Sequence, residues 1–551
     1  METRDEEIGT ATDFAPRPAA VSSAGQRHGL GLLMALATLI LLVWRLDRPA
    51  LWLDESATAL ATQRTWPHLW LLLQGADAPL VPFYALLKVV TDAVVSLAPR
   101  AAEHPEWLYR GPSVLAMALA VWALSVWLGR FAPPGVVLAG GVILLATGGM
   151  SRYGQEARPY AMVLLATVFA TIVWSRLVLD RRRRWLPLYV LTLILLVAAN
   201  SLASTLIVAH LVAATVAPER GQRWRAFRRT VLGAAIAVLL VAPLVITVTL
   251  HGKGATRFPP LTPENLFTAF VHLFTLGEHP WLGVGALLPF TLLGLTQVIS
   301  PKYRFLTRVV VPWAVLPPLF LLPAVIVRPN LLIGRYLLFV VPAWAILGGL
   351  GVVTLVELGR RLLGNAAVLL AGALLVTAVV SQVPSLTVVR QPGGHGEDIR
   401  PALAEANRPG YADLPIFLAT RLGTSELGAY ARADEPRLLG TQIQRDQRSI
   451  WPWAEPSDLR RVRVRDADRV ILLMRDSSLV PACGTVTLNR SLAGLNGCLP
   501  SVLRNMRFHV VSADRKGTRW TFVLLDRYPL LRPPGSPSLI GSPPARSPKV
   551  M

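Results

Sequence analysis

Two adjacent carboxylates, Asp54 and Glu55, stand in the segment Leu-Trp-Leu-Asp-Glu-Ser-Ala-Thr-Ala (residues 51–59), just beyond the first long apolar run of the chain. Ionised groups near a bilayer are costly unless they are hydrated, paired or bound to a cation. Acids placed at the mouth of a helix bundle therefore favour a functional role. The alternative is a hydrated pair that caps a short helix.

A second polar segment adds a third acid. Residues 151–160 read Ser-Arg-Tyr-Gly-Gln-Glu-Ala-Arg-Pro-Tyr and lie between two apolar stretches. A connection between membrane spans does not need the charges of Arg152, Glu156 and Arg158. The segment therefore favours a functional role, with an Arg-Glu-Arg ion-pair latch as the alternative.

The composition excludes an ordinary soluble enzyme. Of 551 residues, 53% are hydrophobic and 16% charged, and the mean hydropathy is +0.47, which is typical of a polytopic membrane protein. A run at 78–98, interrupted by Pro82, Lys88 and Asp92, favours an interfacial helix in the first outer loop. The eleven apolar runs long enough to cross about 30 Å of hydrocarbon are near 30–47, 111–129, 134–149, 159–175, 185–199, 202–217, 230–250, 281–299, 309–327, 336–356 and 364–382.

Charge placement supports eleven spans, because short cytoplasmic loops collect Lys and Arg. With the amino terminus in the cytoplasm, the inner loops hold 16 Lys or Arg in 42 residues, whereas the outer segments hold 12 in 113. Counting 78–98 as a span would turn the four arginines at 181–184 outward. The predicted topology places Asp54, Glu55 and Glu156 on one outer face.

The formal charge of +22 and the pI of about 11.1 do not require nucleic acid as a partner. Most of the concentrated positive charge lies in the inner loops, where anionic lipid is the simpler partner. Residues 1–28 lack the basic-then-apolar order of a signal peptide, so we expect a disordered cytoplasmic tail. Residues 29–382 then form the transmembrane domain, in a multi-pass protein of the cell membrane.

Hydropathy falls after Ser381, and residues 383–530 are predicted to form a small extracytoplasmic α/β domain. Strand-like runs occur at 414–418, 469–474, 508–512 and 520–525, and helices are expected near 399–406, 425–431 and 501–506. Residues 531–551 belong to a Pro-rich segment expected to be a disordered tail. Cys483 and Cys498, the two cysteines, are candidates for a disulfide, with two unpaired thiols as the alternative.

Three motifs in order resemble the C-type (GT-C) polyprenyl-phosphate-sugar-dependent membrane glycosyltransferases, which include protein O-mannosyltransferases and aminoarabinose transferases. The motifs are Asp54-Glu55 in a long first outer loop, Tyr-Gly-Gln-Glu-Ala-Arg-Pro-Tyr at 153–160 and Ile-Gly-Arg-Tyr-Leu-Leu at 333–338. The likeness covers residues 30–380, and the second motif is most similar to actinobacterial mannosyltransferase-like proteins. The resemblance implies inverting transfer of a sugar, with mannose as the first expectation, from a polyprenyl-phosphate donor to an acceptor hydroxyl in the cell envelope.

The resemblance also implies roles for residues. Asp54, Glu55 and Glu156 are the predicted catalytic residues, with Asp54 as the base and Glu55 orienting it or sharing a cation. Arg335 is the best-placed group for the donor phosphate, because guanidinium offers a bidentate fork; its alternative role is an interfacial anchor. The predicted substrate-binding residues are Asp77, Arg152, Tyr153, Gln155, Arg158, Arg335 and Tyr336.

One position departs from the family pattern. Many relatives carry His-Pro-Pro-Leu before the interfacial helix, whereas residues 77–80 here read Asp-Ala-Pro-Leu. Asp77 either replaces the histidine as a polar or metal-facing group or has lost that task. Glu55 and Asp77 are candidate ligands for a divalent cation, Mg²⁺ or Mn²⁺, since such ions prefer oxygen ligands. Metal dependence, the sugar and the acceptor, whether protein, glycan or lipid, stay open.

Two other functions compete with glycosyl transfer. A transporter or lipid flippase places ionisable residues at mid-bilayer and often contains repeats of broken helices, but here the acids gather at one face and no repeat is visible. A non-catalytic envelope scaffold that kept the transferase fold is allowed by the altered stretch at Asp77. A retaining hydrolase is disfavoured, because adjacent Asp54 and Glu55 cannot flank a glycosidic bond from opposite sides.

Overall fold

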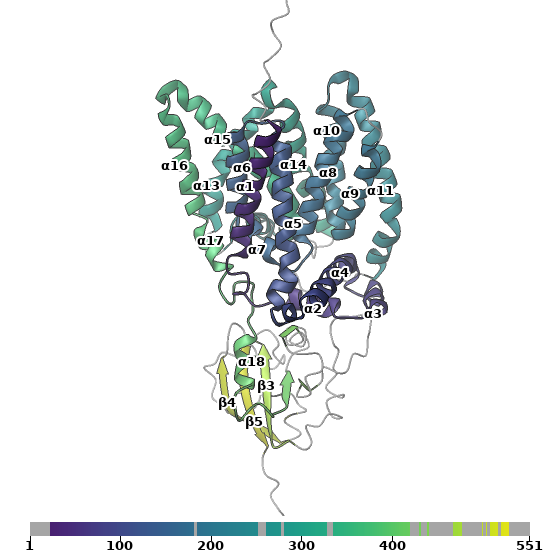
Figure 1. Ribbon diagram of the computed structural model, residues 1–551, viewed down its shortest axis with the longest axis vertical. Coiled ribbons are helices and arrows are strands. Elements are labelled where there is room, and N and C mark those ends of the chain that lie inside the picture. The colour runs from purple at the N-terminus through teal and green to yellow at the C-terminus, as the bar shows by residue number, and fades with distance from the viewer. Residues whose placement is uncertain are drawn as a thin grey trace, which may run out of the picture.

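A helical bundle and a smaller sheet below it make up the protein (Figure 1). The computed structural model describes residues 23–180, 184–251, 261–276, 280–327, 334–418, 429–430, 438–439, 467–475, 499, 503, 507–515 and 520–527. Cys483, Cys498 and the expected tail at 531–551 lie outside these residues, so the disulfide stays a prediction.

The bundle contains the long apolar helices that the hydropathy predicts. Eight helical segments in the described ranges are long and apolar enough to cross a membrane, and the bent pair α6–α7 makes a ninth. The main bundle helices are α1 (Ala24–Val43), α5 (Pro105–Leu128), α6 (Pro134–Ala146), α7 (Gly148–Gln155), α8 (Tyr160–Leu179), α9 (Trp185–Ala199), α10 (Thr205–Val216), α11 (Arg223–His251), α13 (Pro280–Leu295), α14 (Arg304–Val327), α15 (Val341–Leu363) and α16 (Ala366–Val380).

The loop between α1 and α5 folds into short helices at one end of the bundle. Figure 1 shows α2 (Leu53–Thr62), α3 (Trp66–Leu71) and α4 (Val81–Leu97) together between the bundle and the sheet. The segment Ala78–Leu97, which includes α4, is one of the eight that qualify as spans by length and composition, yet it lies beside α2 and α3. With this segment set aside, and with the bent pair and three shorter apolar helices included, the described chain contains eleven apolar segments, as predicted.

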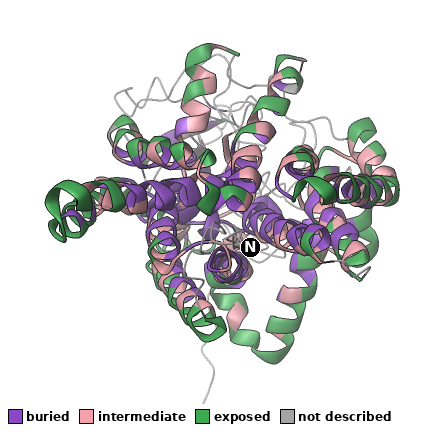
Figure 2. Cartoon of the chain, turned by 90° about the horizontal axis from the view of Figure 1, so that it is seen from above, coloured by how far each residue is buried: buried purple, intermediate pink, exposed green. Residues whose placement is uncertain are grey.

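The helix α15 lies at the centre of the bundle, whereas α11 and α16 lie at its edge. In α15 78% of the most apolar window is buried, against 22% in α11 and α16, and Figure 2 shows the buried residues gathered in the middle of the bundle. Small residues allow this packing. A Cβ on Gly351 of α15 would clash with the carbonyl oxygen of Phe290 in α13.

Two boundaries differ from the sequence predictions. The helix α1 begins at Ala24 rather than near residue 29, because Ser23 and Gln26 form a reciprocal capping box; the tail boundary at 28 is corrected accordingly. Residues 151–155, expected within the connection between two spans, are helical in α7. The chain bends by 67° before α7, because the Gly148 N–H donates to the Phe274 carbonyl at 2.8 Å instead of continuing α6.

The carboxy-terminal sheet has strand order β2-β1-β3-β5-β4. Its first three strands are parallel, and β5 is antiparallel to both β3 and β4. Alternation places Ile471 and Phe522 on the face covered by α18 (Arg400–Ala406), whereas Leu472 and Val523 face the other side. The strands are β1 (Ile416–Leu418), β2 (Leu438–Leu439), β3 (Arg469–Arg475), β4 (Phe508–Arg515) and β5 (Trp520–Arg527).

Four of these strands and α18 match the predicted segments within a few residues, and β2 was not predicted. The expected helices at 425–431 and 501–506 lie mostly outside the described residues. The sheet nevertheless confirms a small α/β domain after the last bundle helix.

Candidate active site

The helix α2 carries Asp54 and Glu55 in its first turn, where negative charge is favoured by the helix dipole. The Glu55 carboxylate also reaches back to the Trp52 N–H at 3.4 Å and so helps to cap the helix. Successive residues of a helix point about 100° apart, so the two acids face different surroundings.

Glu55 is sealed in a buried ion pair. Arg110 Nε donates to its Oε1 at 2.8 Å and Arg110 Nη2 to its Oε2 at 2.6 Å, and neither side chain is exposed. The Ala157 N–H donates to Glu55 Oε1 at 2.9 Å. The rest of the Arg110 guanidinium binds the carbonyls of Leu46, Pro49 and Ala50. Glu55 therefore joins the loop between α1 and α5 to the segment between α7 and α8.

Asp54 faces two other arginines at a partly open position. Arg335 Nη2 lies 3.0 Å and Arg158 Nη2 3.8 Å from Asp54 Oδ2, and the Asp54 side chain is 21% exposed. The loop motif at 153–160 and the late Arg-Tyr motif thus meet the first acid, as the sequence predicts. One carboxylate between two guanidinium groups leaves one positive charge uncompensated.

Glu156 forms an ion pair with Arg152, one helical turn before it in the chain. Arg152 Nε donates to Glu156 Oε1 at 2.9 Å, and its two terminal nitrogens bind the carbonyls of Gly394 and His395 at 2.9 and 3.1 Å. Each of the three guanidinium nitrogens of Arg152 therefore has an acceptor in the protein. These contacts tie Glu156 to the segment 389–399, here called the strap, and the role of Arg152 in substrate binding stays a prediction.

The strap connects the bundle to the sheet domain and contacts the site. The His395 ring is buried, with Nδ1 3.2 Å from Arg110 Nη2 and 3.5 Å from Glu55 Oε2. Just beyond the strap, Arg400 binds the Asp47 carbonyl and the Glu106 carboxylate. Tyr430 of the sheet domain donates to Glu106 at 2.8 Å. The sheet domain is thus linked to the loop that carries Asp54.

Arg335 reaches the site from the 3₁₀ helix η9 (Gly334–Val340). Its Cζ lies 5.2 Å from the Trp52 ring centre and 5.9 Å from that of Tyr160, distances at which ring faces attract a cation. A Cβ at Gly334 would clash with the Ala269 carbonyl, so a glycine is needed for η9 to approach α12 (Pro263–Val271). This close approach places Arg335 beside an apolar pocket.

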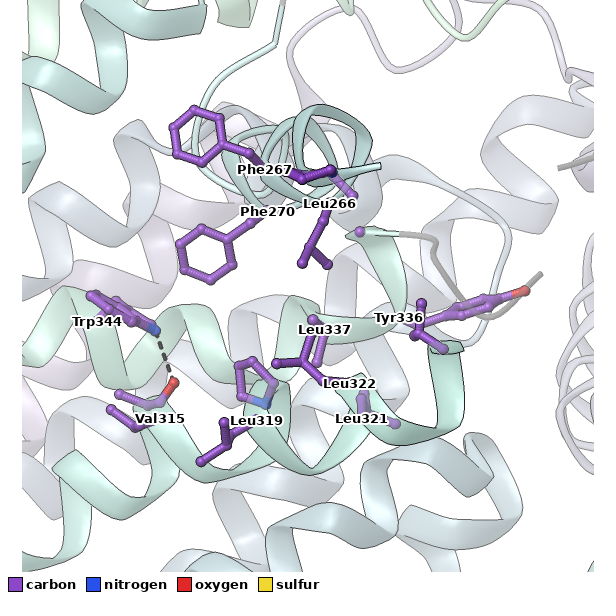
Figure 3. Close-up of a pocket in the computed structure, with 16 residues that line it drawn as sticks. Leu266, Phe267, Phe270, Val315, Leu319, Leu321, Leu322, Tyr336, Leu337 and Trp344 are labelled. Atoms are coloured by element: carbon purple, nitrogen blue, oxygen red, sulfur yellow. Dashed lines mark hydrogen bonds between the residues drawn. The ribbon is translucent and has the colours of Figure 1, made fainter. Parts of the chain in front are cut away.

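The apolar pocket lies between α12, α14, η9 and α15 and encloses about 560 Å³. In Figure 3 Phe267 and Phe270 lie on one side and Leu319 and Leu322 on another, while Trp344 and Tyr336 mark opposite ends. The Trp344 N–H donates to the Ala314 carbonyl at 3.1 Å. Both chain neighbours of Arg335, Gly334 and Tyr336, line the pocket.

Burial and neighbouring arginines set the protonation states of those site residues that lie outside the membrane-spanning helices. Burial raises the pKa of Glu156, and Arg152 and Arg335 oppose this effect. Burial also acts to raise the pKa of Glu55, but Arg110 outweighs it and holds that pKa below its usual range. Burial and the nearby Arg110 lower the pKa of His395 to about 3. Glu55 is therefore ionised and His395 neutral near pH 7.

The remaining predicted residues lie around this centre. Asp77 is buried and interacts electrostatically with Tyr84, whose hydroxyl lies 3.5 Å from Arg158 Nη1. Tyr153 packs edge-on against Tyr160 at 5.3 Å. Gln155 donates to the Leu42 carbonyl at 2.6 Å and anchors the end of α1, and Tyr336 lines the pocket. Asp77 and Tyr336 therefore border the site, while Gln155 supports it.

The donor set does not fit a metal centre at Glu55. Both of its carboxylate oxygens bind Arg110, and among the described residues no group of three or more His, Cys, Asp and Glu side chains gathers that could hold a metal ion. The predicted pairing of Glu55 with Asp77 around a divalent cation would have to break the Arg110 contact.

Three residues of the site received no role from the sequence: Trp52, Arg110 and Tyr160. Arg110 was detectable in principle, because a lone arginine at the start of an apolar span requires a partner. Trp52 and Tyr160 stood within quoted motifs, but aromatic residues at a membrane boundary are common anchors. Their position around Arg335 follows only from the packing.

No family model matches the chain, and no curated protein matches its sequence. The fold is similar to two crystal structures of ArnT from Cupriavidus metallidurans. The structure bound to undecaprenyl phosphate has a TM-score of 0.51 and 15% identity, covering 90% of this chain and 98% of that one. The apo structure has a TM-score of 0.51 and 13% identity, covering 91% and 98%.

A weaker likeness is found with the archaeal oligosaccharyltransferase AglB from Archaeoglobus fulgidus, solved with an inhibitory peptide and a dolichol-phosphate. Its TM-score is 0.42, with 12% identity, and it covers 74% of this chain and 63% of that one. The likeness to ArnT confirms the predicted fold class, a polytopic helical bundle followed by a small domain. It does not by itself assign chemistry to the residues.

Proposed function

We propose that this protein is a membrane glycosyltransferase that moves a sugar from a polyprenyl-phosphate donor to an acceptor hydroxyl. One observation carries the proposal: Arg335 pairs with Asp54 at 3.0 Å while its chain neighbours line an apolar pocket of about 560 Å³. A ligand that suits both places has an anionic head and a long apolar chain. ArnT, with the same fold, was solved with undecaprenyl phosphate bound.

The charges of the site match such a donor. The Glu55–Arg110 and Glu156–Arg152 pairs are internally balanced. Asp54, opposite Arg158 and Arg335, leaves one positive charge, which suits a phosphodiester with one negative charge. The negative charge on phosphate grows as the sugar leaves, and guanidinium groups stabilise it there.

The proposed reaction is a single displacement. Asp54 takes the proton of the acceptor hydroxyl, whose oxygen forms a bond to the anomeric carbon. The bond from that carbon to the phosphate oxygen breaks, and its electron pair stays on the phosphate beside Arg335 and Arg158. Attack from the face opposite the phosphate inverts the anomeric centre. The proposal includes mannose as the sugar and the outer face of the cell membrane as the place of the reaction. The acceptor hydroxyl belongs to a glycan, a protein or a lipid.

The test is transfer from a radiolabelled donor. Membranes that contain the wild-type protein are incubated with polyprenyl-phosphate [³H]mannose, and the labelled product is isolated and identified. We expect label in a glycosidic product from the wild type and none from Asp54→Asn. A parallel incubation with polyprenyl-phosphate glucose tests the sugar. If neither donor gives a product, with a folded protein and its membrane acceptors present, the proposal is contradicted.

A further inference from the structure

Buried polar atoms without partners concentrate around Arg335. Among the described residues, Trp52 Nε1, Tyr160 Oη, Arg158 Nε, Arg335 Nε and Glu156 Oε2 are buried and have no hydrogen-bond partner. Native proteins pair nearly all such atoms, because leaving one unpaired costs free energy. Several of them in one place therefore indicate that a polar ligand completes the site.

The aromatic members of this group surround the arginine. The Trp52 ring lies near two guanidinium groups, with Arg335 Cζ at 5.2 Å and Arg152 Cζ at 5.7 Å from its centre. Tyr160 contacts Arg335 from another side, at 5.9 Å. Arg335 is held by these ring faces and by Asp54, which accepts from Nη2. Its Nε–H therefore belongs to the same cluster as the indole N–H and the phenol O–H.

The orphan atoms differ in hydrogen-bonding character. An indole N–H and the guanidinium N–H groups only donate, and a phenol O–H donates or accepts. Phosphate oxygens accept and carry negative charge, so they suit these donors. Glu156 Oε2 is an acceptor when ionised and would repel a phosphate, but it suits a sugar hydroxyl. The cluster thus separates a phosphate position from a sugar position.

Building on the function proposed above, we propose that Trp52 and Tyr160 bind the phosphate of the lipid donor. Their ring faces hold the Arg335 guanidinium, and the Trp52 N–H and the Tyr160 O–H donate to non-bridging phosphate oxygens. These two groups add hydrogen bonds without adding charge, so the site keeps the single excess positive charge that suits the donor.

Conservative substitutions separate the polar contacts from the ring contacts. Trp52→Phe keeps an aromatic ring beside Arg335 and Arg152 but lacks the N–H, and Tyr160→Phe keeps its ring but lacks the O–H. Trp52→Leu removes the aromatic ring and the N–H. Two matched controls are Trp70→Phe on α3, where the ring is exposed, and Tyr109→Phe, whose hydroxyl accepts from Gln63 outside this cluster.

Binding is measured on full-length protein in phosphatidylcholine nanodiscs, with [³H]undecaprenyl phosphate as the probe and undecaprenol as the phosphate-free comparison. We expect each Phe variant to bind undecaprenyl phosphate about tenfold more weakly, the loss of one hydrogen bond to a charged group. Trp52→Leu should lose more, and both controls should bind as the wild type does. Binding of undecaprenol should change in none of the variants.

The outcomes separate this inference from the proposed function. Wild-type affinity for undecaprenyl phosphate in both Phe variants would overturn the phosphate role of Trp52 and Tyr160 and leave the proposed function standing. A wild-type protein that binds undecaprenyl phosphate no more tightly than undecaprenol would overturn both. Equal weakening for undecaprenol would show that the rings only shape the apolar pocket. Melting temperatures confirm that each variant is folded.

Discussion

Asp54 and Glu55 are neighbours in the chain but belong to two different regions. Glu55 lies in a sealed anchor, formed with Arg110 and His395, in which both of its carboxylate oxygens are bonded. Asp54 lies in an open site, formed with Arg158, Arg335, Glu156 and Trp52, and keeps some exposure. The comparison shows that adjacent acids of one helix can differ: Glu55 is saturated by contacts that hold the loops together, whereas Asp54 keeps exposed surface for the ligand proposed above.

The arginines follow the same division. In the sealed anchor, the Arg110 guanidinium donates hydrogen bonds to Glu55 and three backbone carbonyls. Arg335 of the open site contacts one carboxylate and two rings and keeps a buried N–H unpaired within the described structure. A saturated arginine stabilises the fold, whereas an unsaturated one can bind a ligand.

The largest expected effect is the loss of activity in Asp54→Asn. Removing a general base lowers turnover by about 10²- to 10⁴-fold. Stability should change by less than about 1 kcal/mol, because a partly exposed ion pair contributes little. Transfer rates and melting temperatures of wild type and variant, both in the same detergent, provide the measurement. A large drop in melting temperature would show that Asp54 stabilises the fold as Glu55 does, and the contrast between the two acids would be wrong.

Substitutions in the sealed anchor should show the opposite pattern, with stability lost first. Arg110→Met or Glu55→Gln leaves a buried charge without its partner, at a cost of about 3–5 kcal/mol. The double variant removes both charges and should be less destabilised than the sum of the single changes. Denaturant unfolding in micelles measures all four proteins. Additive losses would contradict a closed pair.

A smaller effect is expected from Arg335→Lys, which tests the open site. An ammonium group retains the charge but cannot form the planar fork or spread over the Trp52 and Tyr160 rings. We expect kcat/KM for the lipid donor to fall about 10- to 100-fold with little change in melting temperature. The matched control is Arg304→Lys at the other end of the bundle. Unchanged donor kinetics in Arg335→Lys would assign Arg335 an anchoring role.

The sequence predicted what short-range patterns encode. Hydropathy placed the apolar segments, charge bias placed the loops of Asp54 and Glu156 on the same side of the bundle, and strand-like runs located four of the five strands. The three motifs meet as expected because their loops share one end of the bundle. The roles assigned to Asp54, Glu156 and Arg335 remain proposals.

What the sequence did not predict depends on contacts between distant residues. Arg110 and His395 lie 55 and 340 positions from Glu55, and no periodicity relates them. The sequence therefore could not show that Glu55 is saturated and unsuited to a metal. The bend before α7 has the same origin, since it depends on a carbonyl from Phe274. Tertiary packing decided these features.

The smallest expected effect is a pH dependence that originates in the sealed anchor. Burial lowers the pKa of His395 to about 3 from its ordinary 6.5, so between these values the unfolded chain binds a proton that the folded protein does not. The contribution of His395 to stability is therefore present above pH 6.5 and is lost as the pH falls. Glu55 adds a similar loss only below its ordinary pKa of 4.5, so it does not contribute between pH 7 and 5. Burial raises the pKa of Glu156, which acts in the opposite direction, so the share of His395 is read from the difference between the wild type and a His395 variant.

His395→Gln should flatten the stability curve in that interval. The wild type should lose about 1–2 kcal/mol between pH 7 and pH 5, since one pKa unit corresponds to about 1.4 kcal/mol, and the variant should lose clearly less. His68→Gln, on the exposed helix α3, serves as the control and should follow the wild type. Melting temperatures at half-unit steps of pH give the slopes. Identical slopes for wild type and His395→Gln would mean that His395 is hydrated or already charged, and the anchor would then be open to water like the site beside it.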